Sequence, residues 1–286
     1  MDAHAQFRKG LTGIVGIWLT MAMMPLAELL PLTAWQLLIV RGAPGAAVFG
    51  VVILLQKGSI ELPDLNLMLT AVAFTLACVG LFNAILAWGT NLSAVMLDMA
   101  VLVNFCFAVW HKKPVARASV VLFITAIIGS YLALRGWDVP NLNIAGLLWS
   151  LLALVANGLV IEFGAKTKQD SKVRVFWMSA TLVAAGLLVS WGVPLHLSEP
   201  RLLAIAVLFG VTTGLLNFLC GFRAFSNLPA VAIGVLVLGV TPSILLSSWL
   251  ILGKTLGADQ LAGIGIILTS VGLLGYLLNR ASIKNA

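Results

Sequence analysis

Charged residues are scarce in this chain. Of its 286 residues, 17 are basic and 10 are acidic, while 61% are hydrophobic and the mean hydropathy is +1.08. A soluble domain is about one quarter charged, so this chain has too little polar surface to face water on all sides. The scarcity of charge excludes an ordinary soluble protein and predicts that most of the molecular surface faces lipid.

Histidine and cysteine are also few, and neither residue type forms a reactive pattern. The three cysteines are scattered through apolar runs, which argues against a disulfide framework or a metal cluster. His4, His111 and His196 lie in tails or loops. The chain contains no Gly-x-Ser-x-Gly, no His-Glu-x-x-His and no nucleotide-binding loop. We therefore expect no cofactor, no metal and no enzymatic activity, and no ATP-driven pump formed by this chain alone.

Long apolar runs, in contrast, are abundant. A helix needs about 20 apolar residues to cross the hydrocarbon core, and ten such runs are separated by polar breaks. They are approximately Leu11–Leu29, Thr33–Leu55, Leu65–Trp88, Leu92–Trp110, Val115–Leu134, Asn143–Phe163, Val173–Val193, Leu202–Gly221, Ala230–Leu252 and Asp259–Leu278. The runs lack the polar and apolar alternation of a membrane barrel. The sequence predicts an all-α integral membrane protein with ten transmembrane helices.

The positions of the basic residues predict the orientation in the membrane. With the N-terminus inside, 13 basic residues lie on the cytoplasmic side, and only Arg135, Arg201 and Lys254 lie outside. The positive-inside rule therefore favours a multi-pass protein of the cell (inner) membrane with both termini cytoplasmic. The net charge of +7 reflects this topology, so we expect a lipid bilayer and no nucleic acid as a partner.

Ten helices can form two units of five, and an odd number of helices per unit inverts the second unit. We predict a first repeat over residues 1–138 and a second over residues 139–286. Gly16-Ile17-Trp18 weakly resembles Gly146-Leu147-Leu148-Trp149, and chance similarity between apolar helices is the alternative explanation. Inverted repeats are typical of secondary transporters, which bind substrate near the midplane between the two halves.

Arg41 and Asp98 are the two charged residues well inside apolar runs. A charge at the membrane centre costs about 2.5–3.5 kcal/mol, so neither is expected to face lipid. Both lie at similar depth, which permits an ion pair. One hypothesis is that Asp98 binds a proton or a cationic substrate group while Arg41 holds its charge or receives a carboxylate. The alternatives are a fixed structural pair and an arginine that snorkels outward.

Other polar and aromatic residues within the runs are further candidates for contact with substrate. The proline-containing Thr241-Pro242-Ser243 interrupts the ninth run and predicts a break that exposes backbone groups. The remaining candidates are the amides Asn83, Asn104 and Asn217 and the rings of Trp18 and Trp88. Hydrogen bonding between helices is the commoner role of such amides. Glu162 and Lys166, spaced by four residues, are interpreted as a surface ion pair.

The second half of the chain resembles the drug/metabolite transporter superfamily, in particular its ten-helix EamA type. The residues that carry the resemblance are Ala224-Phe225-Ser226-Asn227-Leu228-Pro229-Ala230, Thr241-Pro242-Ser243, Leu252-Gly253-Lys254, Asp259-Gln260, Gly263 and Gly272. In the first half, Arg41 resembles an arginine common in the family's second helix. Three features depart from the family pattern: Lys254 replaces a glutamate, His111-Lys112 replaces Gly-Glu, and the fourth helix has Asp98 near its usual proline.

The resemblance implies a ten-helix bundle with a cavity lined mainly by the third, fourth, eighth and ninth helices. It also implies export of an amino acid, a related metabolite or a drug by alternating access. We expect a small-molecule substrate, with coupling to protons and the choice between monomer and homodimer left open. The alternatives are a membrane-embedded enzyme and a channel or receptor without transport activity.

Overall fold

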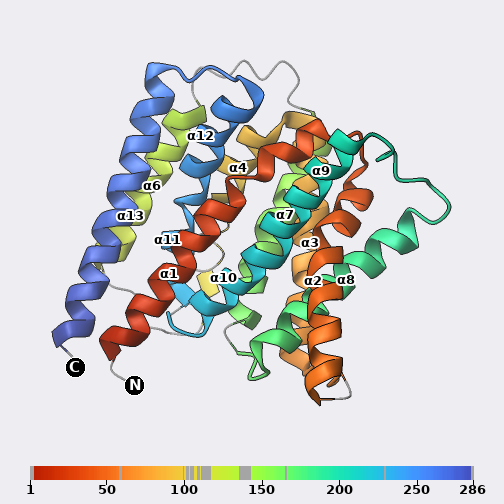
Figure 1. The fold of residues 1–286 in the computed structure, drawn as a ribbon. Coiled ribbons are helices and arrows are strands. Elements are labelled where there is room, and N and C mark those ends of the chain that lie inside the picture. Colours follow the sequence, from red (N-terminus) through yellow and green to blue (C-terminus); the bar gives the residue numbers. More distant parts are fainter. Residues whose placement is uncertain are drawn as a thin grey trace.

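The computed structural model describes residues 3–57, 60–98, 100, 103, 106–107, 110, 117–134, 143–164, 166–228 and 230–284. Every regular element in these ranges is helical. In chain order the elements are α1 (Ala3–Met21), the 3-10 helix η1 (Met24–Leu29), α2 (Ala34–Lys57), α3 (Leu65–Trp88), α4 (Thr90–Asp98), α6 (Arg117–Leu134), α7 (Ile144–Gly164), α8 (Ser171–Val189), α9 (Pro200–Phe209), the π-helical segment η2 (Gly210–Leu216), α10 (Asn217–Phe225), α11 (Ala230–Val237), α12 (Val240–Leu252) and α13 (Ala258–Lys284) (Figure 1).

Eight helical stretches of the described chain are long and apolar enough to cross a bilayer. They are Ala5–Leu29, Ala34–Gln56, Leu65–Trp88, Ile144–Gly164, Ser171–Val189, Pro200–Phe225, Ala232–Leu252 and Ala258–Leu277. Each corresponds to one predicted run, so the expectation of an all-α, multi-pass membrane protein is confirmed at this level. The predicted fifth run holds a shorter apolar helix, Val120–Ala133. Much of the predicted fourth run lies outside the described residues, and the count of ten stays a prediction.

Large apolar side chains cover the outside of the bundle. Leu55, Leu188 and Leu250 are 81%, 79% and 71% exposed. In water, exposure of apolar surface costs a free energy of about 25 cal/mol for each Å². In lipid, the same surface makes the expected contact with the hydrocarbon chains. The exposed leucines therefore agree with the lipid environment inferred from the composition.

Glycines allow the main helix pairs to approach closely, and each pair joins the two halves of the chain. α2 packs along α8, α3 along α7, α1 along α10 and α6 along α13. A Cβ atom on Gly80 of α3 would collide with the backbone of α7, and one on Gly13 of α1 with that of α10. Gly129 and Gly263 meet in the same way between α6 and α13. Small residues commonly permit such contact between membrane helices, and the two halves are interleaved.

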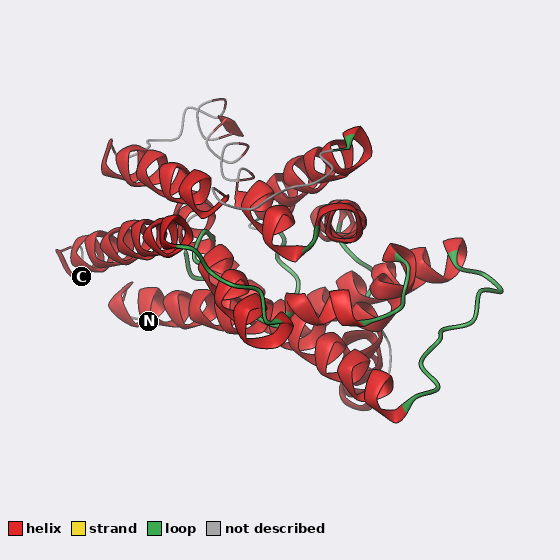
Figure 2. Cartoon of the chain, turned by 90° about the horizontal axis from the view of Figure 1, so that it is seen from above, coloured by secondary structure: helices red, strands yellow, loops and turns green. Residues whose placement is uncertain are grey.

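The chain ends and the connections lie at the two ends of the bundle. Both termini lie at one end of the bundle, and the connection between α12 and α13 lies at the opposite end (Figure 1). The view from above shows the connection between α8 and α9 extending away from the helices (Figure 2). An even number of complete crossings places both termini on one side.

Two interruptions of regular helix lie beside the centre of the bundle. The first is η2, where the eighth predicted run changes to π-helical geometry between α9 and α10. The second is the turn at Leu238 and Gly239, which separates α11 from α12. Pro242 follows in the first turn of α12 and has no N–H for the carbonyl of Leu238, which instead accepts a hydrogen bond from the Thr241 amide at 3.3 Å.

Candidate binding cavity

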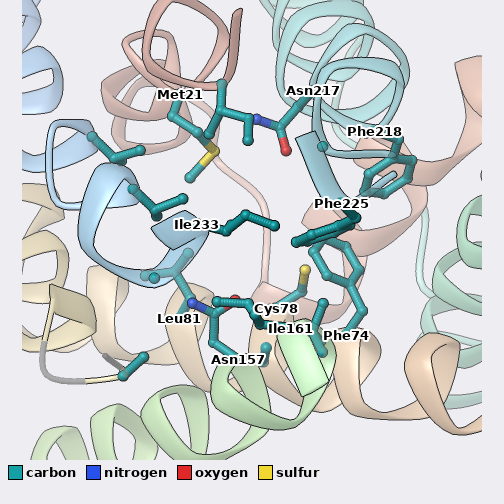
Figure 3. A pocket seen from close by; sticks show the side chains of 18 of the residues that line it. Met21, Phe74, Cys78, Leu81, Asn157, Ile161, Asn217, Phe218, Phe225 and Ile233 are labelled. Carbon is teal, nitrogen blue, oxygen red and sulfur yellow. The ribbon is translucent and has the colours of Figure 1, made fainter. Parts of the chain in front are cut away.

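A cavity of about 120 Å³ lies between the two halves of the chain. Residues of α3, α4, α10, α11 and α12 line it, together with residues of α1, α2, α7 and α8. The spans that the family resemblance assigns to a central cavity therefore all contribute. Most of the wall is apolar, and its polar side chains are Arg41, Asn157, Asn217 and the thiol of Cys78. Figure 3 shows Asn157, Asn217 and Cys78 around the space.

Arg41 is the one formally charged residue among the described residues that line the cavity. Its side chain is only 2% exposed. The guanidinium Nε donates to the Thr213 carbonyl oxygen at 3.0 Å, and Nη1 and Nη2 lie 3.4 Å from Cys78 Sγ and 3.9 Å from Met21 Sδ. Thioether and thiol sulfur accept hydrogen bonds weakly, so the described residues provide this cation with one strong acceptor, the Thr213 carbonyl.

The π-helical segment positions Arg41 by packing directly on the backbone of α2. Gly210 lies against the carbonyl of Val40, and Gly214 lies against the carbonyl of Arg41. Pro44 leaves the Val40 carbonyl without its usual intrahelical partner, yet α2 continues through this position. π-helical turns are rare and are frequent at functional sites. Here the turn also provides the Thr213 carbonyl that orients the guanidinium.

Two aromatic rings lie beside the guanidinium. Its Cζ atom lies 5.1 Å from the ring centroid of Phe74 and 5.8 Å from that of Phe82. Phe74 in turn packs edge-on against Phe218 at 5.0 Å between centroids. Ring faces stabilise a cation by about 0.5–2 kcal/mol, which partly offsets the cost of burying Arg41. The charge is thus held inside the protein without snorkelling to the interface.

Two amides reach the cavity from α10 and α7, both in the second half of the chain. The Nδ2 atom of Asn217 donates to Thr20 Oγ1 at 2.9 Å and ties α10 to α1. Asn157 lines the cavity from α7 and has no hydrogen-bond partner among the described side chains. Figure 3 shows the two amides on opposite sides of the cavity. The sequence placed both amides in membrane spans, but only the folded chain identifies Asn157 as a lining residue.

Trp18, Thr241 and Ser243 lie around the break between α11 and α12 and are absent from the cavity lining. The indole Nε1 of Trp18 donates to the Leu236 carbonyl at 2.9 Å. The Thr241 hydroxyl donates to the Ala94 carbonyl of α4 at 3.2 Å, and the Ser243 hydroxyl donates to the Gly239 carbonyl at 3.0 Å. These side chains therefore satisfy backbone groups near the break, while Pro242 is buried beside them.

Asn83 and Trp88 lie on α3 away from the cavity. Asn83 Nδ2 donates to the Val79 carbonyl one turn earlier at 2.8 Å, and the Trp88 ring lies against the backbone of Gly146. Asn104 lies outside the described residues. Asp98 is the last residue of α4, and its side chain also lies outside them. The pairing of Asp98 with Arg41 remains a prediction.

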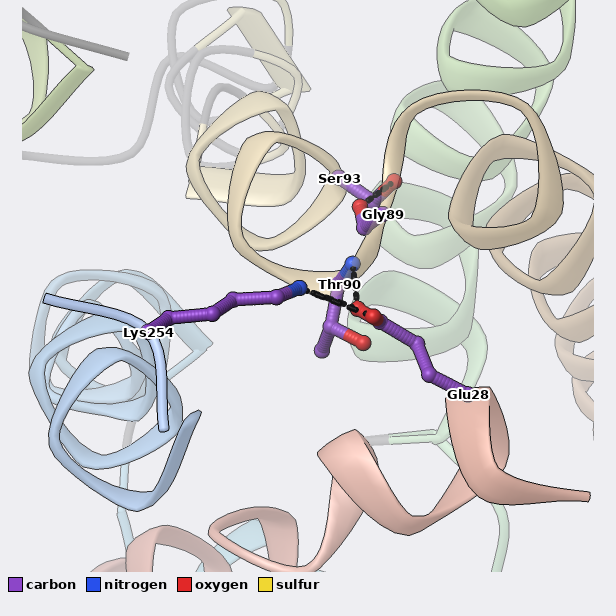
Figure 4. A network of polar contacts seen from close by, with 5 residues as sticks. All are labelled: Glu28, Gly89, Thr90, Ser93 and Lys254. Atoms are coloured by element: carbon purple, nitrogen blue, oxygen red, sulfur yellow. Dashed lines mark hydrogen bonds and ion pairs between the residues drawn. The ribbon is translucent and has the colours of Figure 1, made fainter. Parts of the chain in front are cut away.

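A polar network lies at the end of the bundle opposite the termini, where α12 connects to α13 (Figure 1), and Figure 4 shows its residues. Lys254 Nζ lies 2.9 and 2.8 Å from the two carboxylate oxygens of Glu28. The same carboxylate accepts a hydrogen bond from the Thr90 amide at 2.5 Å. Gly253 and Gly89 precede Lys254 and Thr90 with φ of 66° and 83°, a left-handed conformation that favours glycine. The network joins η1, the start of α4 and the connection between α12 and α13.

A second polar network joins the connection before α3 to the connection after α7. The Asp64 carboxylate accepts from the Leu67 amide at 2.6 Å and from the Thr167 hydroxyl at 3.2 Å. Partial burial raises the pKa of Asp64, but these hydrogen bonds, that of the Lys168 amide and the charge of Arg174 outweigh it and hold this pKa below its ordinary value. This network ties the two halves together outside the membrane.

The predicted pair of Glu162 and Lys166 is confirmed, with 2.8 Å between Nζ and Oε1. Its interpretation as a surface pair is wrong for the carboxylate. The Glu162 side chain is only 8% exposed, whereas that of Lys166 is 45% exposed. The last turns of α7 bury Ile161, Glu162 and Gly164 against the bundle, so Lys166 reaches inward to pair with the buried carboxylate.

Comparison with known proteins shows the fold and no more. No protein-family model matches the chain, and no curated protein does. Of the solved structures, 28 chains match. One, described only as "Crystal structure of protein", superposes with a TM-score of 0.77 at 13% identity, over 97% of this chain and 98% of that one. The architecture is therefore one already seen in a crystal over its full length.

Proposed function

We propose that this protein is a secondary transporter of a small metabolite, such as an amino acid, a related compound or a drug. The observation that carries the proposal is a cavity between the two halves that holds a buried cation beside a π-helical segment and a broken helix. Transporters bind their substrates near the midplane beside interrupted helices. Irregular backbone at membrane depth is tolerated where it lines a cavity.

The proposed architecture is two inverted repeats of five helices, residues 1–138 and 139–286, related to the EamA-type transporters. The packing pattern supports it. The contact of α2 with α8 and that of α6 with α13 each join equivalent helices of the two repeats, and the contact of α3 with α7 is matched by that of α10 with α1. A pseudo-two-fold axis between two five-helix units generates these pairs. Termini at one end of the bundle agree with ten crossings.

Export by alternating access is the proposed mechanism, in the inner membrane with both termini cytoplasmic. In this orientation the network of Glu28, Thr90 and Lys254 is on the outer side and holds together the outer ends of three spans. We propose that this network is the closed outer gate. Substrate would enter from the cytoplasm, and release outward would require the network to open while the two halves rock about the cavity.

Solute counterflow in proteoliposomes tests the proposal. Vesicles loaded with each member of an amino-acid and carboxylate library are diluted into labelled solute, and uptake is followed with time. A transporter gives saturable uptake that is accelerated by unlabelled solute on the opposite side. Flux that rises linearly with concentration would instead indicate a channel, and no flux for any solute would favour an enzyme or a receptor.

A further inference from the structure

The guanidinium of Arg41 presents two donors toward the cavity without strong acceptors. Nε donates to the Thr213 carbonyl, whereas the acceptors that Nη1 and Nη2 meet among the described residues are the sulfur atoms of Cys78 and Met21. Nη1 and Nη2 form the end-on fork of the guanidinium. Such a fork matches the two oxygens of a carboxylate, and the resulting pair of charge-assisted hydrogen bonds is among the strongest in proteins. A carboxylate that displaced the two weak sulfur contacts would meet this fork.

The charge of Arg41 also lacks a counter-charge in the part of the chain that the structure describes. At 2% exposure the cation is removed from water, and an isolated buried charge is costly unless it is paired. The aromatic rings of Phe74 and Phe82 compensate only part of this cost. A ligand that carries one negative charge would neutralise the site as it binds.

The rest of the cavity is suited to an apolar body. Six apolar side chains surround the space (Figure 3): Phe74, Phe218, Phe225, Met21, Ile161 and Ile233. An engineered apolar cavity of about 150 Å³ holds benzene, so the 120 Å³ here suits an apolar part no larger than a benzene ring or a branched chain. Asn157 adds one amide without a partner among the described side chains, which is available to a polar substituent.

We infer that the cavity binds a small amphipathic monoanion, a carboxylate whose apolar part is a ring or a branched chain. The carboxylate lies on Nη1 and Nη2 of Arg41, in place of the two sulfur contacts, and the apolar part packs against the aromatic wall. The inference rests on the proposed function, because it takes this ligand to be the transported solute. It narrows the substrate class from metabolites in general to monoanions.

Three isosteric probes test the charge requirement on the wild-type protein. Benzoate, benzamide and benzamidine have the same shape and number of heavy atoms but are anionic, neutral and cationic at pH 7. Binding to purified protein is measured by isothermal titration calorimetry in detergent. Benzoate is expected to bind about 10- to 100-fold more tightly than benzamide, because hydrogen bonds between charged groups are stronger than those to a neutral amide. Benzamidine is expected to bind most weakly. Equal affinities, or a preference for benzamidine, would overturn the inference.

Variants of Arg41 then locate the site. R41Q is expected to remove the preference for benzoate over benzamide, and R41K is expected to keep part of it, because lysine retains the charge without the planar fork. R223Q is the matched control, since Arg223 lies exposed on α10 outside the cavity lining. If R41Q retains the full preference for benzoate, Arg41 is not the anion site. If R41Q fails to fold, R41K still reports the loss of the fork.

The outcome separates this inference from the proposed function. Selective binding of benzoate without counterflow of any carboxylate would support the anion site and refute transport. Saturable counterflow of neutral or cationic solutes, unchanged in R41K and accompanied by no benzoate binding, would support transport and refute the anion site.

Discussion

Breaking the contact between Lys254 and Glu28 is expected to open the cavity toward the proposed outer side. Lys254 lies within 2.9 Å of both carboxylate oxygens, and the two side chains are 32% and 23% exposed. Fully exposed ion pairs contribute about 0.2–1 kcal/mol, and hydrogen bonds to charged groups about 1.5–3 kcal/mol. A half-buried pair of this kind falls between, at about 1–2 kcal/mol. Lys254→Gln should therefore lower the ratio of closed to open states about 5- to 30-fold.

Labelling of a cysteine in the cavity measures this shift. Leu238 lines the cavity and is 1% exposed, so Leu238→Cys in a background without the native cysteines reports access from outside. A membrane-impermeant maleimide added to right-side-out vesicles should react about 5- to 30-fold faster when Lys254→Gln is also present. Arg201→Gln is the matched control, because Arg201 is an exposed basic residue on the same proposed side.

Reversal of the two charges provides the decisive comparison. Glu28→Lys combined with Lys254→Glu restores the ion pair but loses the acceptor for the Thr90 amide, so the labelling rate should return part of the way to the wild-type value. Unchanged labelling in Lys254→Gln, or equal rates in the single and the reversed double variant, would refute the role of this pair as a gate.

Two further predictions rest on other contacts, and a third rests on the position of Asp98 in the sequence. Gly214→Ala places a Cβ atom on the Arg41 carbonyl and should destabilise the protein by about 1–3 kcal/mol. Gly265→Ala is the control, because nothing lies within 4 Å of its added Cβ. Equal melting temperatures of the two variants would contradict the packing argument. Asp64→Asn should destabilise the protein at pH 7. Because folding lowers the pKa of Asp64, its stabilisation is present above the unfolded pKa of about 3.9 and is lost as pH falls through the folded pKa. The melting temperatures of wild type and variant should therefore converge below about pH 4, and a constant difference would argue against this origin. Asp98→Asn should flatten the pH dependence of counterflow, and an unchanged rate and profile would remove Asp98 from the mechanism.

Sequence patterns were sufficient for features that depend on composition along one helix. The predicted runs agree with eight membrane-competent helices, because hydropathy over about 20 residues is a local property. Arg41 was also identified locally, since a charge within an apolar run must avoid lipid. The break near Pro242 is local too, because proline always lacks its N–H.

Other features depend on residues far apart in the chain and could not be predicted locally. Glu28 and Lys254 are separated by 226 positions, and each read alone is an ordinary charge at a helix end. The burial of Glu162 depends on how α7 packs. Asn83 and Asn157 are both amides within apolar runs, but only the packing of the bundle places Asn157 at the cavity and leaves Asn83 bonded to its own helix.

Composition establishes that lipid is the main solvent of this protein, since 27 charged residues among 286 cannot cover a water-facing surface. The order of residues also locates the apolar runs that form helices and the two charges, Arg41 and Asp98, that must be sheltered from lipid. The groups that shelter Arg41 are visible only in the folded chain: a π-helical segment, two sulfur atoms and the rings of Phe74 and Phe82. The physical reason is that helix formation in lipid satisfies backbone groups within each segment, whereas a cavity exists only between segments.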